Sequence, residues 1–313
     1  MRPDTSCRDV EVALPPALTR FGARTTCRVS GAEGAPPIVV LGGISADRFA
    51  CTRADGTGGW WPGLVGAGCA IDPRRHRIIG LDFAADAEGR SAPTTADQAE
   101  VLCAALDSTG AAAAELIVGA SYGGMVALAL AQHRPERVRR LAIISAPAEP
   151  HPMATAMREL QRRAVALGLA HGDGAMGLSI ARGLAMLTYR TPEEFGARFA
   201  GGLGGDDPLA PSAPGAYLRA RGDAYQVVMS PKRFLSLSAS IDRHRVDPER
   251  IDQPTLVIGA TSDRLVPPEQ VEALAAALPN SRLHLIDSRY GHDLFLKETA
   301  RIAPLVAAFA EDL

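Results

Sequence analysis

The segment that most constrains the fold of this chain is residues 119–124, Gly-Ala-Ser-Tyr-Gly-Gly. It contains a G-x-S-x-G signature, in which a serine occupies a sharp turn between a strand and a helix. An apolar β-type run, residues 115–118, precedes it, and a helix-periodic run, residues 125–131, follows it. The small residues around Ser121 permit strained backbone angles. This context favours a nucleophile elbow over an ordinary glycine-serine turn, the alternative for the pentapeptide alone.

Apolar runs of strand length alternate with helix-periodic stretches along much of the chain. The predicted strands are residues 37–41, 76–83, 115–118, 141–145, 255–259 and 282–286, and the clearest helices are residues 96–106 and 124–133. This alternation is typical of an α/β protein with a mostly parallel sheet and helices on both faces. Together with the elbow it predicts the α/β-hydrolase fold.

The alternation stops between about residues 147 and 252, where the sequence reads as helices and loops. Such a stretch is too long for a simple connection. We therefore expect a core made of residues 1–146 and 253–313, with residues 147–252 inserted as a helical lid over the carboxyl edge of the sheet. Within it, Thr191 is the expected N-cap of a helix, with Glu194 closing a capping box.

A serine hydroxyl becomes a good nucleophile only when a neighbouring base takes its proton. In this fold the partners follow the serine in the order acid, then histidine, each after a late strand. Asp263 follows the strand at 255–259, and His292 follows the strand at 282–286. The predicted catalytic triad is therefore Ser121, Asp263 and His292.

Other acids and histidines could compete for these roles. The competing acids are Asp82, Asp252, Asp287 and Asp293, which could equally be solvated loop charges or helix caps. The remaining histidines lie in the lid, at the end of a surface helix or within a strand. Only His292 follows both the serine and the acid along the chain, lies in the loop after the strand at 282–286 and has small neighbours.

An acyl-transfer site also needs two N–H donors for the oxyanion. The residue after the nucleophile, Tyr122, supplies one from its backbone. The other is expected from the loop after the first predicted strand, where Gly43 is favoured over Ile44. The glycines there are also compatible with a simple turn.

The composition is that of an ordinary enzyme: 313 residues, 47% hydrophobic and 22% charged, with a formal net charge of −2. No long run of like charge is present, so we expect neither a nucleic-acid nor a membrane partner. The five cysteines form no C-x-x-C pair, so neither a disulfide framework nor a zinc site is implied. We expect no bound metal or cofactor. The first residues lack a signal-peptide core, and a cytoplasmic location is expected.

Several segments resemble the α/β-hydrolase-fold homoserine O-acyltransferases of methionine biosynthesis. They are residues 59–61 (GWW) with 66–72 (GAGCAID), the elbow up to Met125, and residues 290–296 (YGHDLFL). In the lid, Ala181-Arg182 followed by residues 187–190 (LTYR) is similar to the family segment whose arginine and tyrosine bind homoserine. The loop at residues 41–46 (LGGISA) looks more like the succinyl-using branch than the acetyl-using one.

The resemblance implies a ping-pong reaction in which Ser121 takes an acyl group from acyl-CoA, a co-substrate, and passes it to homoserine. It implies that Arg182, Tyr189 and Asp293 bind substrate, and that the protein is a homodimer through the lid. Without it, Arg182 would be read as a solvated arginine and Tyr189 as a packing residue. The alternatives are a carboxylesterase on the same triad, an acyltransferase with serine or a larger hydroxylated acceptor, and a silent binding module.

Overall fold

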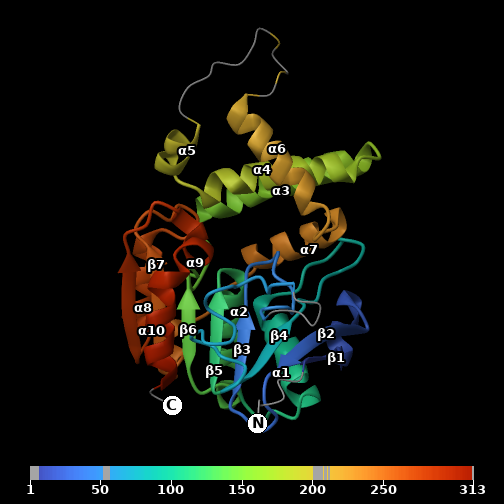
Figure 1. The fold of residues 1–313 in the computed structure, drawn as a ribbon. Helices are drawn as coiled ribbons and strands as arrows, with labels where there is room; N and C mark the ends of the chain where they lie inside the picture. The colour runs from blue at the N-terminus through green and yellow to red at the C-terminus, as the bar shows by residue number, and fades with distance from the viewer. Residues whose placement is uncertain (1–6, 52–56, 200–206, 208–209, 211, 312–313) are drawn as a thin grey trace.

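The computed structural model describes residues 7–51, 57–199, 207, 210 and 212–311. Within these residues an eight-stranded sheet runs in the order β1-β2-β4-β3-β5-β6-β7-β8 (Figure 1). The strands are β1 (Cys7–Ala13), β2 (Arg24–Ser30), β3 (Pro37–Leu41), β4 (Arg77–Leu81), β5 (Leu116–Ala120), β6 (Leu141–Ile144), β7 (Thr255–Ala260) and β8 (Ser281–Ile286). Strands β3 to β8 pair in parallel, and β1 and β2 pair antiparallel at one edge. The predicted α/β-hydrolase architecture is confirmed, but β1 and β2 were not predicted.

Helices cover both faces of the sheet. On one face lie α1 (Thr95–Ser108), α2 (Tyr122–His133) and α8 (Pro268–Ala277), and on the other lies α10 (Thr299–Glu311). Short helical turns are η1 (Pro16–Phe21), η2 (Pro135–Arg137), η3 (Pro248–Arg250), η4 (Gly291–Asp293) and α9 (Leu294–Lys297). Two buried apolar clusters, one on each face, hold these layers together.

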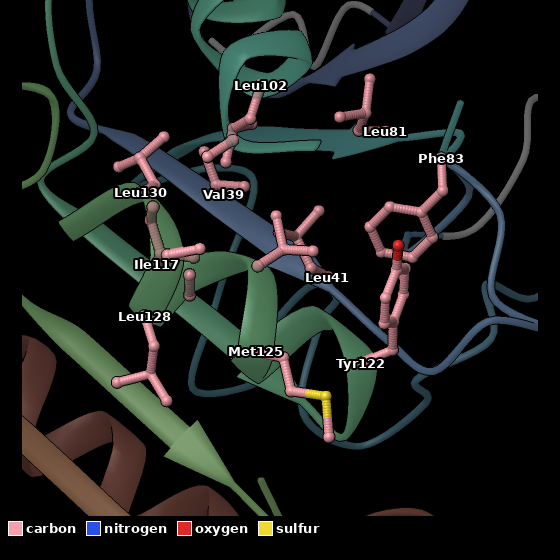
Figure 2. Close-up of a cluster of buried hydrophobic side chains, with 14 of the residues drawn as sticks. Val39, Leu41, Leu81, Phe83, Leu102, Ile117, Tyr122, Met125, Leu128 and Leu130 are labelled. Atoms are coloured by element: carbon pink, nitrogen blue, oxygen red, sulfur yellow. The ribbon is translucent and has the colours of Figure 1, made fainter. Parts of the chain in front are cut away.

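Part of the larger cluster surrounds the strand that precedes the serine (Figure 2). Its members include Val39 and Leu41 from β3, Ile117 from β5, and Leu128 and Leu130 of α2. The Tyr122 ring packs edge-on against Phe83, with 4.8 Å between ring centroids. The first turn of α2 is therefore embedded in the core, which fixes the turn that carries Ser121.

In the described residues between β6 and β7, five α-helices precede the short turn η3: α3 (Pro152–Ala170), α4 (Gly174–Tyr189), α5 (Pro192–Arg198), α6 (Ala213–Tyr225) and α7 (Pro231–Asp242). Figure 1 places them beyond the carboxyl ends of the strands, with α7 nearest the sheet and α3, α4 and α6 farther out. We call residues 147–252 the lid.

The start of α5 differs in one respect from the prediction. Thr191 caps the helix by accepting a hydrogen bond from the Glu194 N–H, at 3.2 Å. The Glu194 carboxylate, however, pairs with Arg190 at 2.5 Å and does not close a capping box. A charged guanidinium is a stronger partner for a carboxylate than a backbone N–H, which explains the difference.

Candidate active site

Ser121 lies between the end of β5 and the start of α2, with a φ of +52°. This left-handed conformation is strained for a residue with a side chain. The neighbouring glycines make the turn feasible, because a Cβ at Gly123 would lie 2.5 Å from the Leu41 backbone and one at Gly119 would lie 2.6 Å from the Gly123 carbonyl oxygen. The residues thus form the strand-turn-helix geometry expected of a nucleophile elbow.

The three predicted triad residues lie together. His292 Nε2 is 2.9 Å from Ser121 Oγ, and His292 Nδ1 is 2.8 Å from Asp263 Oδ2. The Asp263 and His292 side chains are almost fully buried. With Nδ1–H donating to the carboxylate, Nε2 is the acceptor that can take the serine proton.

The loops that carry the acid and the histidine are fixed by hydrogen bonds. Asp263 Oδ1 accepts from the N–H groups of Leu265 and Val266, at 2.8 and 3.0 Å, which leaves Oδ2 to face His292. Gly291 has a φ of +55°, and a Cβ there would lie 3.0 Å from the Tyr189 carbonyl oxygen. A glycine at this position therefore allows the histidine loop to approach the end of α4.

Burial and charge act in opposite directions on His292. Burial would lower the pKa of the imidazole, but the negative charge and hydrogen bond of Asp263 outweigh it and raise the pKa above the usual value of 6.5. The carboxylate therefore stabilises the imidazolium that forms when the serine proton is transferred.

The competing acids have other environments. Asp82 pairs with Arg48 at 2.7 Å, and Asp293 lies 2.8 Å from Nε of Arg190. Asp252 and Asp287 are exposed. Of the five candidate acids, only Asp263 hydrogen-bonds to His292.

The two predicted oxyanion donors lie in adjacent loops. Tyr122 is the first residue of α2, where backbone N–H groups have no intrahelical acceptor. The Gly123 N–H donates to the Gly42 carbonyl at 2.9 Å, which ties the elbow to the loop after β3. Gly43 lines the cavity beside Ser121, and a Cβ there would meet no atom within 4 Å. This placement is compatible with the predicted roles of Tyr122 and Gly43.

Ser121 and His292 open into a cavity of about 210 Å³ between the sheet edge and the lid. Its apolar lining includes Ile44, Trp60 and Phe295. Trp60 stacks on Trp61, whose Nε1–H donates to the Phe295 carbonyl at 2.7 Å. The GWW and YGHDLFL segments, far apart in sequence, thus form one wall of the site.

The structure places all three predicted substrate-binding residues on the cavity: Arg182, Tyr189 and Asp293. The Arg182 guanidinium lies over the rings of Tyr225 and Tyr189, at 4.5 and 5.4 Å. No hydrogen bond or ion pair to Arg182 occurs in the described part of the chain. The Tyr189 ring lies 5.7 Å from that of His292. Arg182 is therefore a cation held by aromatic rings, with its N–H donors available to a ligand.

Asp293 supplies the opposite charge. Burial raises the pKa of its carboxyl, an effect that the charge of Arg190 partly opposes. Arg190 also pairs with Glu194, so two carboxylates share one guanidinium and this end of the cavity is net negative. An unpaired cation and a net negative group on one cavity match the two charges of an amino acid.

Sequence reasoning missed several polar side chains of the cavity, among them Arg158 and Gln161 on α3. They are spaced three residues apart, which was the only available signal that they share a helix face.

In the described residues, no cluster of three or more His, Cys, Asp or Glu side chains could hold a metal ion. None of the described helices has the length and apolar character needed to cross a membrane.

Comparison with known proteins agrees with this architecture. The sequence model of the alpha/beta hydrolase fold family matches residues 36–299. A homoserine O-succinyltransferase from Xanthomonas campestris pv. campestris is 43% identical over 275 residues, covering 87% of this chain and 74% of its own. A homoserine O-acetyltransferase from Thermus thermophilus is 31% identical over 288 residues, covering 82% of this chain and 73% of its own.

Two solved structures resemble the whole chain in fold. Esterase E22 has a TM-score of 0.84 at 20% identity and covers 98% of this chain and 100% of its own. Homoserine O-acetyltransferase from Bacillus anthracis has a TM-score of 0.84 at 16% identity and covers 98% and 97%. The fold and the serine-centred cavity define an α/β hydrolase. Within that fold, the sequence relationships show that the chain belongs to the homoserine O-acyltransferase family.

Proposed function

We propose that this protein transfers an acyl group from acyl-CoA to the hydroxyl of L-homoserine, with succinyl-CoA favoured over acetyl-CoA as donor. The observation that carries the proposal is the shared cavity: the Ser121–His292–Asp263 hydrogen-bond chain opens onto it beside the unpaired cation of Arg182 and the net negative end at Asp293. A simple acyl-ester hydrolase has no need for paired charges at the acceptor position.

The first half-reaction forms an acyl-enzyme. His292 Nε2 takes the proton of Ser121 Oγ, which attacks the thioester carbonyl while the N–H groups of Tyr122 and Gly43 stabilise the oxyanion. The carbon–sulfur bond breaks, and His292 returns its proton to the departing thiol of coenzyme A. Asp263 holds the imidazole in the required tautomer throughout.

The second half-reaction uses the same groups. Arg182 binds the homoserine carboxylate, Asp293 faces its ammonium group, and His292 deprotonates its hydroxyl. The hydroxyl oxygen attacks the acyl-enzyme, and Ser121 leaves with the proton that His292 returns. The lid excludes water, which would otherwise hydrolyse the intermediate.

The experiment that tests the proposal follows both products. The purified protein is incubated with succinyl-CoA or acetyl-CoA, with and without L-homoserine, and thiol release and O-acylhomoserine are measured. We expect O-acylhomoserine equal to the thiol released. Thiol release that homoserine does not accelerate, with free acid as the only product, would overturn the proposal.

A second candidate, a carboxylesterase, is favoured by the likeness in fold to esterase E22. Both activities use the same Ser121 chemistry and differ only in what attacks the acyl-enzyme. Hydrolysis of short-chain esters at rates that homoserine does not divert would support the esterase. L-Serine and larger hydroxylated compounds, offered as acceptors in the same assay, test the remaining alternatives.

The outer surface of the lid favours a homodimer. Six large apolar side chains on α3 and α4 are between 47% and 68% exposed: Met153, Leu160, Leu167, Met176, Ile180 and Leu187. The three on α3 are seven residues apart and share one helix face. Large apolar side chains exposed on neighbouring helices are typical of an interface between subunits. Sedimentation should show a dimer that Leu160→Asp dissociates, whereas Leu283→Asp on exposed β8 should leave it intact.

The cellular location follows from the donor. Acyl-CoA is available inside the cell, and all five cysteines, Cys7, Cys27, Cys51, Cys69 and Cys103, are free thiols. Both features support a cytoplasmic location.

A further inference from the structure

The loop that follows β3 carries Gly43, the proposed oxyanion donor, to the cavity, and we call residues 42–50 the β3 loop. Two hydrogen bonds set the direction of the Gly43 backbone. The Gly42 carbonyl accepts from the Gly123 N–H, and the Gly43 carbonyl accepts from the Ala46 N–H, both at 2.9 Å. The first bond ties Gly43 to the nucleophile elbow. The second ties it to its own loop, so the place of Gly43 depends on how the rest of the loop is held.

A chain of four charged side chains holds the middle of the β3 loop against the sheet. Arg48 of the loop contacts two carboxylates, those of Asp82, directly after β4, and of Asp9 on β1. Asp9 also accepts a hydrogen bond from Arg28 of β2, at 2.8 Å. The four charges alternate in sign, so each carboxylate lies against a guanidinium. The loop is thereby joined to three neighbouring strands.

Asp82 fixes the backbone of Arg48 as well as its side chain. Its Oδ1 accepts from the Arg48 backbone N–H at 2.8 Å, and its Oδ2 accepts from Arg48 Nη1 at 2.7 Å. Charge-assisted hydrogen bonds are short and strong, and two of them on one residue fix it closely. A Cβ at Gly80 would lie 2.2 Å from the Arg48 carbonyl oxygen, so the loop also touches the β4 backbone directly. Arg48 is therefore the residue at which the loop is fixed to β4.

Aromatic side chains hold the residues next to Arg48. The Phe49 ring contacts the guanidinium groups of Arg28 and Arg48, which lie 4.9 and 4.4 Å from its centroid. The Trp60 Nε1–H donates to the Asp47 carbonyl at 3.0 Å, and Trp60 also lines the cavity. Because its neighbours on both sides are held, a displacement of Arg48 would shift the turn at the start of the loop.

We propose that Arg48 and Asp82 are positioning residues that place the Gly43 N–H where negative charge develops on the acyl carbonyl. The inference rests on the acyl-enzyme chemistry of the proposed function, whichever acceptor follows. Neither side chain is among the described residues that line the cavity, so both act through the β3 loop. Loss of one oxyanion donor lowers kcat by about 10²–10³-fold, and a displaced donor should lose part of that contribution.

The experiment measures acylation of Ser121 without an acceptor, by thiol release in the first turnover and by intact mass. Asp82→Asn keeps the size of the side chain but removes its charge. It should lower the acylation rate constant by roughly 10–100-fold and change the apparent affinity for acyl-CoA by less than about threefold. Glu11→Gln is the matched control, because it breaks an exposed ion pair, with Arg24, between the same β1 and β2. An unchanged rate in folded Asp82→Asn, or an equal loss in Glu11→Gln, would contradict the inference.

A boronic acid distinguishes positioning of the oxyanion donor from a general loss of stability. It forms a tetrahedral adduct with the serine, with an oxygen in the place of the oxyanion, so its affinity should fall in Asp82→Asn by about the same factor as the acylation rate. Unchanged boronate affinity alongside a lower rate would overturn the inference.

The pH dependence of acylation distinguishes an effect on Gly43 from an effect on the triad. It should keep its shape in Asp82→Asn, because the charged groups that face His292 are Asp263, Asp293 and Arg158, and none of them is changed. A shifted acid limb would show that Asp82 acts through the triad and would contradict the proposed role.

Arg48→Lys tests the other partner and decides the matter if Asp82→Asn fails to fold. It keeps the positive charge and the backbone bond to Asp82, but a lysine cannot bridge two carboxylates as the guanidinium does. Acylation should slow by roughly 3–10-fold, with a matching loss of boronate affinity. Unchanged values in folded Arg48→Lys would contradict the inference.

A p-nitrophenyl ester replaces acyl-CoA in the same measurements if thioesters do not acylate Ser121. The oxyanion forms with either substrate, so the same losses are expected in Asp82→Asn and Arg48→Lys. Those losses would uphold the inference and count only against the acyl donor of the proposed function, whereas unchanged ester rates would overturn the inference itself.

Discussion

At the carboxyl edge of the sheet, the reacting side chains are held by backbone. The Ser121 turn depends on close glycine contacts, and two backbone N–H groups orient Asp263. On the lid side of the cavity, the charged side chains are held mainly by other side chains: Arg182 by two tyrosine rings, and Arg158 by Asp242. Backbone contacts fix position closely, whereas side-chain contacts can change with single substitutions.

This difference assigns separate tasks to the two regions. In the proposed function, the sheet edge supplies the serine that attacks a carbonyl, a chemistry common to esterases and acyltransferases. The lid supplies Arg182, which is proposed to bind the acceptor. We therefore expect changes at the sheet edge to stop both half-reactions, and changes in the lid to affect one substrate at a time.

The largest effect is expected for Ser121→Ala. Turnover should fall below about a thousandth of the unmodified rate, with no acyl adduct in the intact mass, because the nucleophile is absent. Ser145→Ala is the matched control: Ser145 directly follows β6 with a φ of +51°, but the Ser121 hydroxyl, not that of Ser145, contacts His292. Near-normal rates in Ser121→Ala would refute the assigned nucleophile.

Asp263→Asn should lower the rates of both half-reactions by about 10²–10⁴-fold. His292 loses the carboxylate that fixes its tautomer and stabilises its positive charge. It should also change the pH profile. Activity requires neutral His292, so the rate falls as pH drops through its pKa, which Asp263 holds above 6.5. Without that charge, the acid limb should move to lower pH. The pH dependence of kcat/KM provides the check, with exposed Asp287→Asn as control; an inactive Asp287→Asn would show that the acid was assigned wrongly.

Arg182→Ala tests the expectation that a change in the lid affects only one substrate. It should lower kcat/KM for homoserine by roughly 10–150-fold and leave the burst of thiol release intact, since only the acceptor carboxylate loses its partner. Arg182→Lys should rescue only in part, because a point charge cannot reproduce the guanidinium fork. Arg221→Ala, an exposed arginine of α6, is the control. Equal loss in both half-reactions would instead indicate a role in folding or donor binding.

Much of the sheet and its catalytic edge could be predicted because the signals are local. An apolar run, a turn and a catalytic residue type follow one another at the ends of β5, β7 and β8. Strands β1 and β2 were missed because neither has the apolar run of a central strand. The edge strand β1 is largely exposed and rich in charges, and the sequence of β2 is RTTCRVS. The roles of the site residues stay predictions, although the structure brings Ser121, Asp263 and His292 into contact.

The place of Arg158 and Gln161 on the cavity could not be predicted, for a different reason. On an amphipathic helix, Arg158 and Gln161 read as surface residues, but both are buried in the structure, where α4 and α7 pack against α3. The Asp242 carboxylate that fixes Arg158 lies 84 residues further along the chain. Pairings at such separations leave no local pattern, so ion pairs of this kind emerge only from tertiary packing.

The smallest effect on catalysis is expected where the two regions meet, at Tyr122. Its hydroxyl lies 2.5 Å from Ser240 Oγ of α7, so the side chain links the elbow to the lid, whereas the proposed oxyanion role belongs to its backbone N–H. Tyr122→Phe should leave Ser240 unsatisfied and lower the free energy of unfolding by about 1–3 kcal/mol. The rate should fall by less than about threefold, since the backbone donor is retained.

Urea denaturation and kcat, measured on the same samples, separate these two roles of Tyr122. Tyr122→Phe combined with Ser240→Ala is the matched control, because removal of both partners leaves no buried hydroxyl without a hydrogen bond and should restore most of the lost stability. A large fall in kcat with unchanged stability would mean that the Tyr122 side chain itself acts in catalysis. In that case catalysis at the sheet edge would depend on a side-chain contact with the lid, and not on backbone contacts alone.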